Sequence, residues 1–261
     1  MGCCASKYVD SKANRISRWR TTGIVAYRDS KLKSFPSEVL ELGTAVRTLD
    51  LSNNRLVAIP EEIGKLANLQ RLFLVNNIVD RLPINLGSLE SLKILMLDGN
   101  QISSLPDQLG QLLRVERISI SRNTLTSLPS TIGSLRNLSL LNLSSNKLKT
   151  LPETIGSCYA LEELQADDNG VEVLPASICN LTHLKVLSLN NNCIRKIPDE
   201  LLKNCKALQH LSLHGNPVTL DQIHQMEGFS EFEARRKQKY DKQIDSNVMM
   251  GSNALDEGFD L

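Results

Sequence analysis

Three residues at the start of the chain could carry lipid groups. The chain begins MGCCAS, which fits the N-myristoylation pattern M-G-x-x-x-[ST], with Ser6 in the required place. The acyl chain would join the freed amine of Gly2, and Cys3 and Cys4 lie beside it, where thiols are commonly palmitoylated. A single myristoyl chain binds membranes only marginally, with an association constant of roughly 10⁴ M⁻¹, so stable anchoring needs a second signal. We therefore predict dual acylation; the alternative is an unmodified start.

A basic stretch follows this motif and would strengthen the anchor. Five basic residues are opposed by Asp10 alone, for a local net charge of +4: Lys7, Lys12, Arg15, Arg18 and Arg20. Each basic side chain adds about 1 kcal/mol near an anionic leaflet. In the same stretch apolar residues recur at helical spacing: Val9, Ala13, Ile16 and Trp19. The spacing predicts a helix over 9–20 that covers the first strand; the alternative is that its apolar stripe lies on a membrane.

The other residues capable of chemistry do not form a recognisable site. The six cysteines, at positions 3, 4, 158, 179, 193 and 205, have the spacing of neither a disulfide framework nor a zinc site, which indicates a reducing compartment. Cys158 occupies a leucine position and is expected in the core. Cys179 stands where other units have glycine and is expected to be part-buried. His210 and His214 could share one face of the last strand, but two histidines do not make a metal site.

The composition narrows the class of function further. The chain has 261 residues, 41 % hydrophobic and 23 % charged, and its net charge of +1 with few aromatic residues argues against nucleic-acid binding. No apolar run approaches the roughly 20 residues of a membrane span. The sequence has no G-x-S-x-G, phosphate loop or H-E-x-x-H motif. We therefore expect no enzyme activity, no cofactor and no metal.

Asparagine recurs at a fixed interval through most of the chain. Seven asparagines are spaced by 23 residues and an eighth follows after 24: Asn54, Asn77, Asn100, Asn123, Asn146, Asn169, Asn192 and Asn216. Eight prolines fall almost in step, at positions 36, 60, 83, 106, 129, 152, 175 and 198. Each unit has the form L-x-x-L-x-L-x-x-N-x-L-x-x-L-P-x-x-I-G-x-L-x-x-L, as in LKILMLDGNQISSLPDQLGQL. The chain is therefore an array of repeats.

The physical role of each repeat position can be assigned. Alternating leucines give a short strand one apolar face, and the leucines after the asparagine point into the same interior. One unit cannot bury its apolar edge, but stacked units bury a continuous core. The asparagine amide can donate to and accept from backbone groups that would otherwise be unpaired, so we expect a ladder of asparagines along the stack.

The pattern from about residue 24 to 218 resembles the leucine-rich repeat family. The 23-residue version with L-P-x-x-I-G-x-L is similar to the intracellular Ras-group proteins of that family, including their plant members. This resemblance implies an α/β fold, a right-handed curved solenoid with a parallel β-sheet on its concave face. It also implies small GTPases, or the kinases and phosphatases associated with them, as partners.

The units divide the chain into five parts. We expect an acylated flexible anchor over 1–8, an N-terminal helix and half-repeat over 9–45, eight repeats over 46–218, a helical cap over 219–245 and a mobile tail over 246–261. In the half-repeat Ser30 takes the asparagine position. Thr219-x-x-Gln222 and Ser230-x-x-Glu233 match capping boxes and predict two short helices, against which Phe229, Phe232 and Tyr240 would pack. The run Arg235-Arg236-Lys237-x-Lys239 is expected to be solvated, with membrane contact as the alternative.

Side chains that the core does not need are expected on the concave face. We assign partner binding to ten of them: Arg47, Arg71, Phe73, Val75, Lys93, Met96, Arg117, Arg122, Glu163 and Asp168. Further outward positions are Asp50, Asn53, Ile94, Ser119, Glu162 and Asp167, so the face is predicted to change from basic and apolar to acidic. Phe73 and Met96 would lie about 5 Å apart on neighbouring strands. An exposed Phe–Met pair rimmed by arginines is typical of a protein-binding surface; the alternatives are a surface without a partner and, for the acidic cluster, a cation site.

These observations together predict a non-catalytic adaptor in intracellular signal transduction, held by its lipids at the cytoplasmic face of the plasma membrane, with a cytoplasmic pool. We expect a monomer that binds protein partners through the concave face. One alternative is a soluble regulatory subunit of a phosphatase or kinase complex. Another is a purely structural scaffold for receptor complexes.

Overall fold

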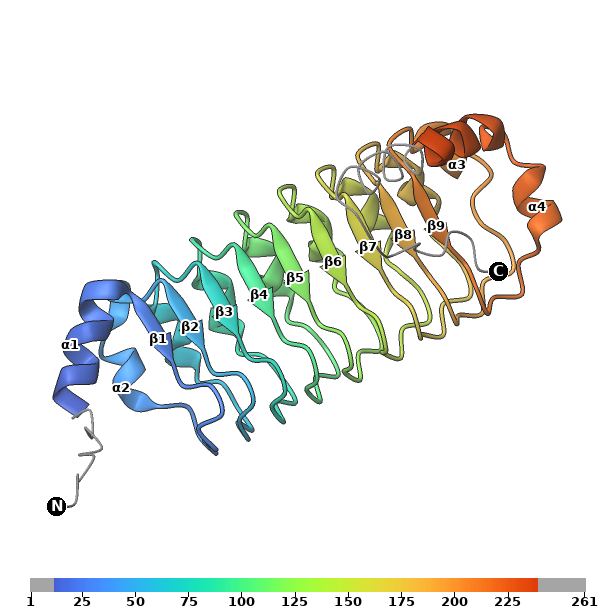
Figure 1. Cartoon of the computed structure of the whole chain (residues 1–261). Coiled ribbons are helices and arrows are strands. Elements are labelled where there is room, and N and C mark those ends of the chain that lie inside the picture. The colour runs from blue at the N-terminus through green and yellow to red at the C-terminus, as the bar shows by residue number, and fades with distance from the viewer. Residues whose placement is uncertain (1–11, 239–261) are drawn as a thin grey trace, which may run out of the picture.

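A computed structural model describes residues 12–238 of the chain, which form one row of stacked coils (Figure 1). Each coil contributes a three-residue strand to a single nine-stranded parallel sheet, in which the strands lie in sequence order. The strands are β1 (Ile24–Ala26), β2 (Thr48–Asp50), β3 (Arg71–Phe73), β4 (Ile94–Met96), β5 (Arg117–Ser119), β6 (Leu140–Asn142), β7 (Glu163–Gln165), β8 (Val186–Ser188) and β9 (His210–Ser212). The curved leucine-rich repeat solenoid expected from the sequence is confirmed.

The register of the sheet follows the repeat period. The middle residue of each strand pairs with the middle residue of the next, as Leu49 does with Leu72, and Leu72 with Leu95. All three side chains are fully buried. Because successive side chains on a strand point to opposite faces, the first and third residues of each strand lie on the concave face.

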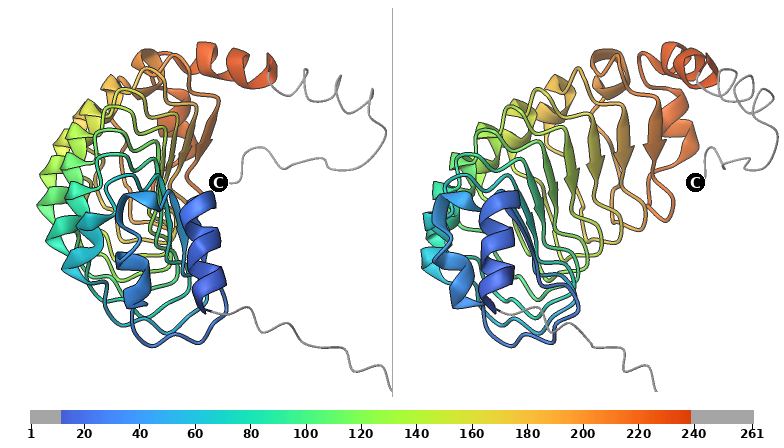
Figure 2. Two further views of the ribbon diagram at one scale, coloured as in Figure 1. Left: turned by 90° about the vertical axis from the view of Figure 1, so that its left-hand side faces the viewer. Right: turned by 60° about the vertical axis from the view of Figure 1, so that its left-hand side comes forward.

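Short helices line the convex side of the stack, opposite the sheet (Figure 2). Six are 3₁₀ helices that follow an extended proline: η2 (Glu61–Lys65), η3 (Ile84–Ser88), η4 (Asp107–Gln111), η5 (Ser130–Ser134), η6 (Glu153–Ser157) and η7 (Ala176–Asn180). The first coil instead has α2 (Ser37–Leu40) and η1 (Gly43–Ala45), and the eighth has α3 (Leu201–Asn204). Proline fixes an extended φ and has no N–H to leave unpaired at the helix start.

Glycine in these 3₁₀ helices is required by the spacing of the coils. A Cβ added at Gly156 would lie 2.2 Å from the carbonyl oxygen of Ser177 in the next coil, and one at Gly133 would lie 2.5 Å from that of Thr154. Cys179 occupies the same repeat position. The coil that follows it is one residue longer and has α3 in place of a 3₁₀ helix, which leaves space for a side chain.

The eight predicted asparagines form a continuous ladder between coils. The Nδ2 of Asn123 donates to the carbonyls of Ile120 in its own coil and Leu97 in the preceding coil, and its Oδ1 accepts from the backbone N–H of Ile102 at 3.0 Å. The same three kinds of bond recur at the other seven positions, from Asn54 to Asn216. The asparagine therefore holds each coil to its neighbour.

The N-terminal coil is closed by α1 (Lys12–Thr22). Trp19 is buried and its ring meets that of Tyr27 at 5.2 Å, while the guanidinium of Arg15 lies 5.8 Å from both ring centres. The Tyr27 hydroxyl donates to Glu38 at 2.6 Å, and burial together with this bond raises the pKa of Tyr27 to about 12. Ile16 and Trp19 of the predicted apolar stripe therefore pack on the solenoid and are not available to a membrane, whereas Val9 lies outside the described residues. Ala13 does not pack with them, because Ala13 is exposed.

The C-terminal end is closed by α4 (Leu220–His224) and a helical segment over 229–238. The capping box of Thr219 and Gln222 is present as predicted. The one predicted at Ser230 is wrong, because the helix already includes residue 229; Glu233 pairs instead with Arg236 at 2.9 Å. Phe232 is fully buried and Phe229 packs partly against the core, whereas Tyr240 and the predicted tail lie outside the described residues.

The basic run at this end is not simply solvated. Arg235 is half-buried, and its guanidinium donates to the carbonyls of Leu208 at 3.1 Å and Leu202 at 3.3 Å. Burial lowers the pKa of Arg235. The side chain therefore pairs backbone groups of the last coils. Within residues 12–238, no helix has the length and apolar character needed to cross a membrane.

Replacing Gly156 with alanine tests the spacing between coils. The new Cβ would overlap backbone of the next coil, so we expect the free energy of unfolding to fall by about 1–3 kcal/mol. Gly170→Ala is the matched control, because a Cβ there meets only Leu148 oxygen at 3.5 Å. Urea unfolding followed by circular dichroism measures both. Equal midpoints for the two variants would contradict the packing argument.

Asn123→Ala tests the ladder. The substitution removes the amide that pairs with the carbonyls of Leu97 and Ile120 and with the N–H of Ile102, in two successive coils. Each buried backbone group left without a partner lowers the free energy of unfolding by about 1–3 kcal/mol. We also expect the amide of Ile102 to exchange with deuterium faster, since its acceptor is lost. The control is Asn180→Ala, an exposed position, which should stay within about 0.5 kcal/mol of the parent. Unchanged exchange at Ile102 would show that the ladder does not hold the coils.

Candidate functional site

The concave face is formed by the first and third residues of the nine strands. Along the first column Arg71, Ile94 and Arg117 are register partners, and along the third Phe73 pairs with Met96. We call these five residues the arginine–apolar patch. Neighbouring strands lie about 4.8 Å apart, so the two arginines lie on either side of Ile94, roughly 10 Å from one another.

The two kinds of side chain in the patch differ in exposure. Arg71 and Arg117 are exposed, whereas Phe73, Ile94 and Met96 are half-buried. The prediction of an exposed Phe–Met pair is therefore wrong in degree, because the neighbouring strands and side chains cover part of both. Val75, which follows β3, is also half-buried. The result is a low apolar floor from which two guanidinium groups project.

Two lysines beside the strands are paired with carboxylates, whereas within residues 12–238 the two arginines of the patch have no ion-pair partner. Lys93 meets Glu116 at 2.8 Å, and Lys185 meets Glu162 at 2.8 Å. Within residues 12–238 neither Arg71 nor Arg117 has an ion-pair partner. The predicted residues Arg47 and Arg122 are exposed, one just before β2 and the other just after β5. Arg71 and Arg117 are thus open to an anionic group from outside the chain.

The acidic end of the face is less available than the sequence indicated. Asp167 accepts hydrogen bonds from the Ser188 hydroxyl at 2.7 Å and from the backbone N–H of Asn190 at 2.7 Å. Asp168 accepts from the Nδ2 of Asn191 at 2.8 Å, and Glu163 accepts from Gln165. These carboxylates are structural acceptors, so the predicted cluster is not an open acidic patch.

Sequence reasoning missed two features of this face. Asp98 accepts from the hydroxyls of Ser119 and Ser121 and from the backbone N–H of Ser121, and Ser119, although it lies on the concave face, is buried there. Leu140 and Val186 continue the first column as half-buried apolar residues. Both lie in the same column as Ile94, at repeat positions that the 23-residue period marks. The period could therefore have predicted them from the sequence.

The histidines do not build a metal centre. The Nε2 of His210 lies 2.7 Å from the Ser212 hydroxyl on the concave side, while His214 is exposed after the strand. Among residues 12–238 no group of three His, Cys, Asp or Glu side chains is placed to hold a metal ion.

The thiols fall into buried and exposed classes. The Sγ atoms of Cys158 and Cys205 donate to the carbonyls of Ile132 and Ile178 in preceding coils. Burial raises the pKa of Cys158 to about 11 and that of Cys205 to about 12, and it also raises the pKa of Cys179. Cys158 is in the core as predicted, and Cys179 is buried more fully than the part-burial predicted. Cys193 is exposed.

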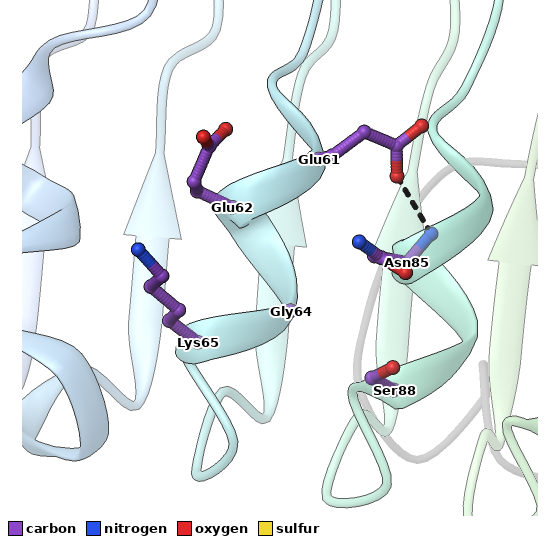
Figure 3. Close-up of a pocket in the computed structure, with 6 residues that line it drawn as sticks. All are labelled: Glu61, Glu62, Gly64, Lys65, Asn85 and Ser88. Atoms are coloured by element: carbon purple, nitrogen blue, oxygen red, sulfur yellow. Dashed lines mark hydrogen bonds between the residues drawn. The ribbon is translucent and has the colours of Figure 1, made fainter.

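A shallow hollow on the convex side separates η2 from η3 (Figure 3). Glu61 reaches across it and accepts from the backbone N–H of Asn85 at 3.0 Å and of Ile84 at 3.3 Å. Glu62, Lys65 and Ser88 line the rest. Glu153 makes the same bond to Ser177 in a later coil, at 3.3 Å. The hollow is therefore an inter-coil contact that caps a helix start.

The sheet, the asparagine ladder and the convex 3₁₀ helices define a leucine-rich repeat protein. Models of the leucine-rich repeat match residues 45–66 and 90–148, and a model of a leucine-rich repeat region matches residues 130–255. The chain is 74 % identical over its full length, and over the whole of the relative, to the plant intracellular Ras-group-related LRR protein 7 of rice. The chain belongs to this plant intracellular Ras-group-related family.

Other relatives share the repeat architecture. An Arabidopsis thaliana protein with LRR repeats and a ubiquitin-like domain is 57 % identical over 250 residues, which is 95 % of this chain and 67 % of that protein. The Arabidopsis receptor kinase HAESA, solved with the peptide hormone IDA and the co-receptor SERK1, matches with a TM-score of 0.62 and 28 % identity. The match covers 70 % of this chain and only 32 % of the HAESA chain.

The predicted lipidation residues Gly2, Cys3 and Cys4 lie outside the described residues.

The burial of the thiols predicts their reactivity and a pH effect. At neutral pH we expect iodoacetamide to modify Cys193 in the folded protein, and Cys158 and Cys205 only after unfolding, because the thiolate is the nucleophile. Above pH 9.0 an unfolded thiol ionises while the two buried thiols stay protonated up to about 11 and 12. Since the unfolded state then binds fewer protons, stability falls as pH rises through this range.

Mass spectrometry of peptides from the folded and the urea-unfolded protein measures the modification. Equal labelling of Cys158 and Cys193 in the folded protein would contradict the assignment of Cys158 to a closed core.

Proposed function

We propose that this chain is a non-catalytic adaptor that is lipid-anchored at the cytoplasmic face of the plasma membrane and binds protein partners through its concave face. The observation that carries the proposal is the arginine–apolar patch, where two exposed guanidinium groups, without an ion-pair partner within residues 12–238, flank a half-buried apolar surface. Arginine and aromatic side chains dominate the binding energy of protein interfaces.

The chemistry of the patch indicates the kind of partner. A guanidinium group binds carboxylates in a two-point geometry, and a partner's apolar side chain would cover Ile94 and Met96. The expected ligand is therefore a protein surface with acidic residues on either side of an apolar anchor. The family name of the rice relative points to small GTPases, or to kinases and phosphatases associated with them, as the partner class. HAESA, a structural neighbour, is described in complex with a peptide hormone and a co-receptor.

Membrane attachment rests on the sequence motif. Myristoylation at Gly2 with palmitoylation at Cys3 or Cys4 supplies the two signals that stable anchoring requires. Confinement to a surface raises the effective concentration for membrane-bound partners. The second candidate function is a soluble regulatory subunit of a phosphatase or kinase complex, in which acylation plays no part.

Proximity labelling in plant cells with a C-terminal tag tests the proposal. The comparison uses the parent chain, Gly2→Ala and the double variant Arg71→Glu/Arg117→Glu, with Arg114→Glu/Arg136→Glu as a charge-matched control at exposed positions outside the sheet. We expect Gly2→Ala to lose plasma-membrane proteins. The patch variant should stay at the membrane but lose, by at least tenfold, a subset that the control retains, since reversing an interface arginine costs more than about 1.4 kcal/mol.

Two results would contradict the proposal in different ways. If Gly2→Ala labels the same proteins as the parent, the anchor is wrong and the soluble-subunit function takes its place. If the patch variant labels the same proteins as its charge-matched control, the concave patch is not the binding surface.

A further inference from the structure

The positive charge of the chain is concentrated at one end of the solenoid. Residues 12–47 contain eight basic and three acidic side chains, a net charge of +5, although the whole chain carries only +1. These residues form α1 and the first coil, up to the start of β2. The remainder of the molecule is therefore slightly acidic, and the charge difference runs along the stack.

The first coil exposes this charge because, within residues 12–238, no further coil is stacked on its outer side, where α1 covers the core. Its loop is held against the second coil on one side only, where the Oδ1 of Asn54 accepts from Ser30 and Leu32. Seen along the stack in Figure 2, α1 and this loop lie at the same end of the molecule. The exposed basic residues there are Arg18, Arg20, Arg28, Lys31 and Lys33, which we call the basic end.

Residues 12–47 supply three acidic groups to counter the basic end. Glu38 is half-buried and accepts the Tyr27 hydroxyl at 2.6 Å. Asp29 lies 4.0 Å from Arg28, with both side chains largely exposed, where an ion pair is weak. Glu41, in the turn after α2, is the third carboxylate of residues 12–47. The net field of the end is therefore positive.

The packing of α1 decides which membrane contact is possible. Trp19 is buried in the core and Ile16 packs against it, so α1 has no apolar face left to insert into lipid. Its exposed side is polar and basic. Contact with a membrane would therefore be electrostatic, with the headgroups of an anionic leaflet as the complementary surface.

We propose that the basic end docks on an anionic lipid surface. The first coil then contacts the membrane, and the concave face stays accessible to protein partners. This inference rests on the membrane attachment proposed above. Gly2 precedes α1 by ten residues, which can span at most about 35 Å, so the lipid anchor would hold the basic end close to the leaflet. Two basic ends repel each other, which disfavours a second copy of the chain as the occupant.

Co-sedimentation with vesicles tests the docking without the anchor. The full chain is made in bacteria that lack the acyltransferases, and its unmodified mass is verified. The probes are vesicles of phosphatidylcholine alone and of phosphatidylcholine with phosphatidylserine. We expect binding only to the anionic vesicles, and weaker binding as salt shortens the Debye length from about 8 Å.

A matched pair of variants locates the surface. Arg20→Gln/Lys31→Gln/Lys33→Gln removes three charges from the basic end, and Lys147→Gln/Lys149→Gln/Arg195→Gln removes three exposed charges from later coils. If each basic residue contributes about fivefold to the partition coefficient for anionic vesicles, the first variant should bind roughly 100-fold more weakly. The second variant should bind almost as the parent does. Circular dichroism melting verifies that both variants are folded.

The outcomes separate this inference from the proposed function. If the unacylated parent does not distinguish the two vesicle types, or if both variants lose binding equally, the docking surface is wrong while an acyl anchor would stand. If the parent binds anionic vesicles and only the first variant loses binding, the docking surface is supported, even where Gly2→Ala leaves the labelling in cells unchanged.

Discussion

The hydrogen bonds of the asparagine ladder are the interaction on which the rest of the structure depends. Each amide satisfies backbone groups in two successive coils, and Asn123 does so from a buried position. The residue before each asparagine turns the chain sharply, because it adopts a left-handed conformation, as at Asn76 and Arg122 with φ of 53° and 52°. That turn ends the strand after three residues in every coil, so all nine strands begin and end in step. Burying an amide that is fully hydrogen-bonded costs far less free energy than leaving the backbone groups around it buried without partners.

The regular strands determine what the concave face can present. Since the register pairs residues that are 23 apart, neighbouring side chains on this face come from successive repeats. Opposite charges on successive repeats form ion pairs, as Lys93 and Glu116 do. Carboxylates near serine hydroxyls accept hydrogen bonds, as Asp167 does from Ser188. The polar side chains that remain available to a partner are those with no oppositely charged or hydrogen-bonding neighbour on the adjacent strands. Within residues 12–238 Arg71 and Arg117 have no ion-pair partner, because their register partners on the neighbouring strands, Thr48, Ile94 and Leu140, carry no charge.

The two ends show how a stack of coils is closed by different means. At the first coil a tryptophan of α1 covers the core while the basic residues of the same helix remain exposed. At the last coil Phe232 fills the core and Arg235 pairs free carbonyls of the coils beneath it. Each end therefore has a polar outer surface, which a repeat protein requires for solubility. The first is strongly positive, and this asymmetry gives the solenoid a direction relative to any charged surface.

The sequence by itself determined the fold, the register of the sheet and the positions of the ladder. The reason is that leucines, asparagines and prolines each recur with the same period of about 23 residues. It also identified Trp19 as a packing residue from its helical spacing, and Phe232 from its place among the predicted cap helices. Only the tertiary structure decided which outward side chains are available. Glu163, Asp167 and Asp168 looked like an acidic cluster in the sequence, but each accepts a hydrogen bond from a donor that lies a full coil away or on the same strand. The start of the last helix, the hydrogen bonds of Arg235 and the burial of Cys179 likewise depend on contacts between coils, and these arise from the stacking distance rather than from any local pattern.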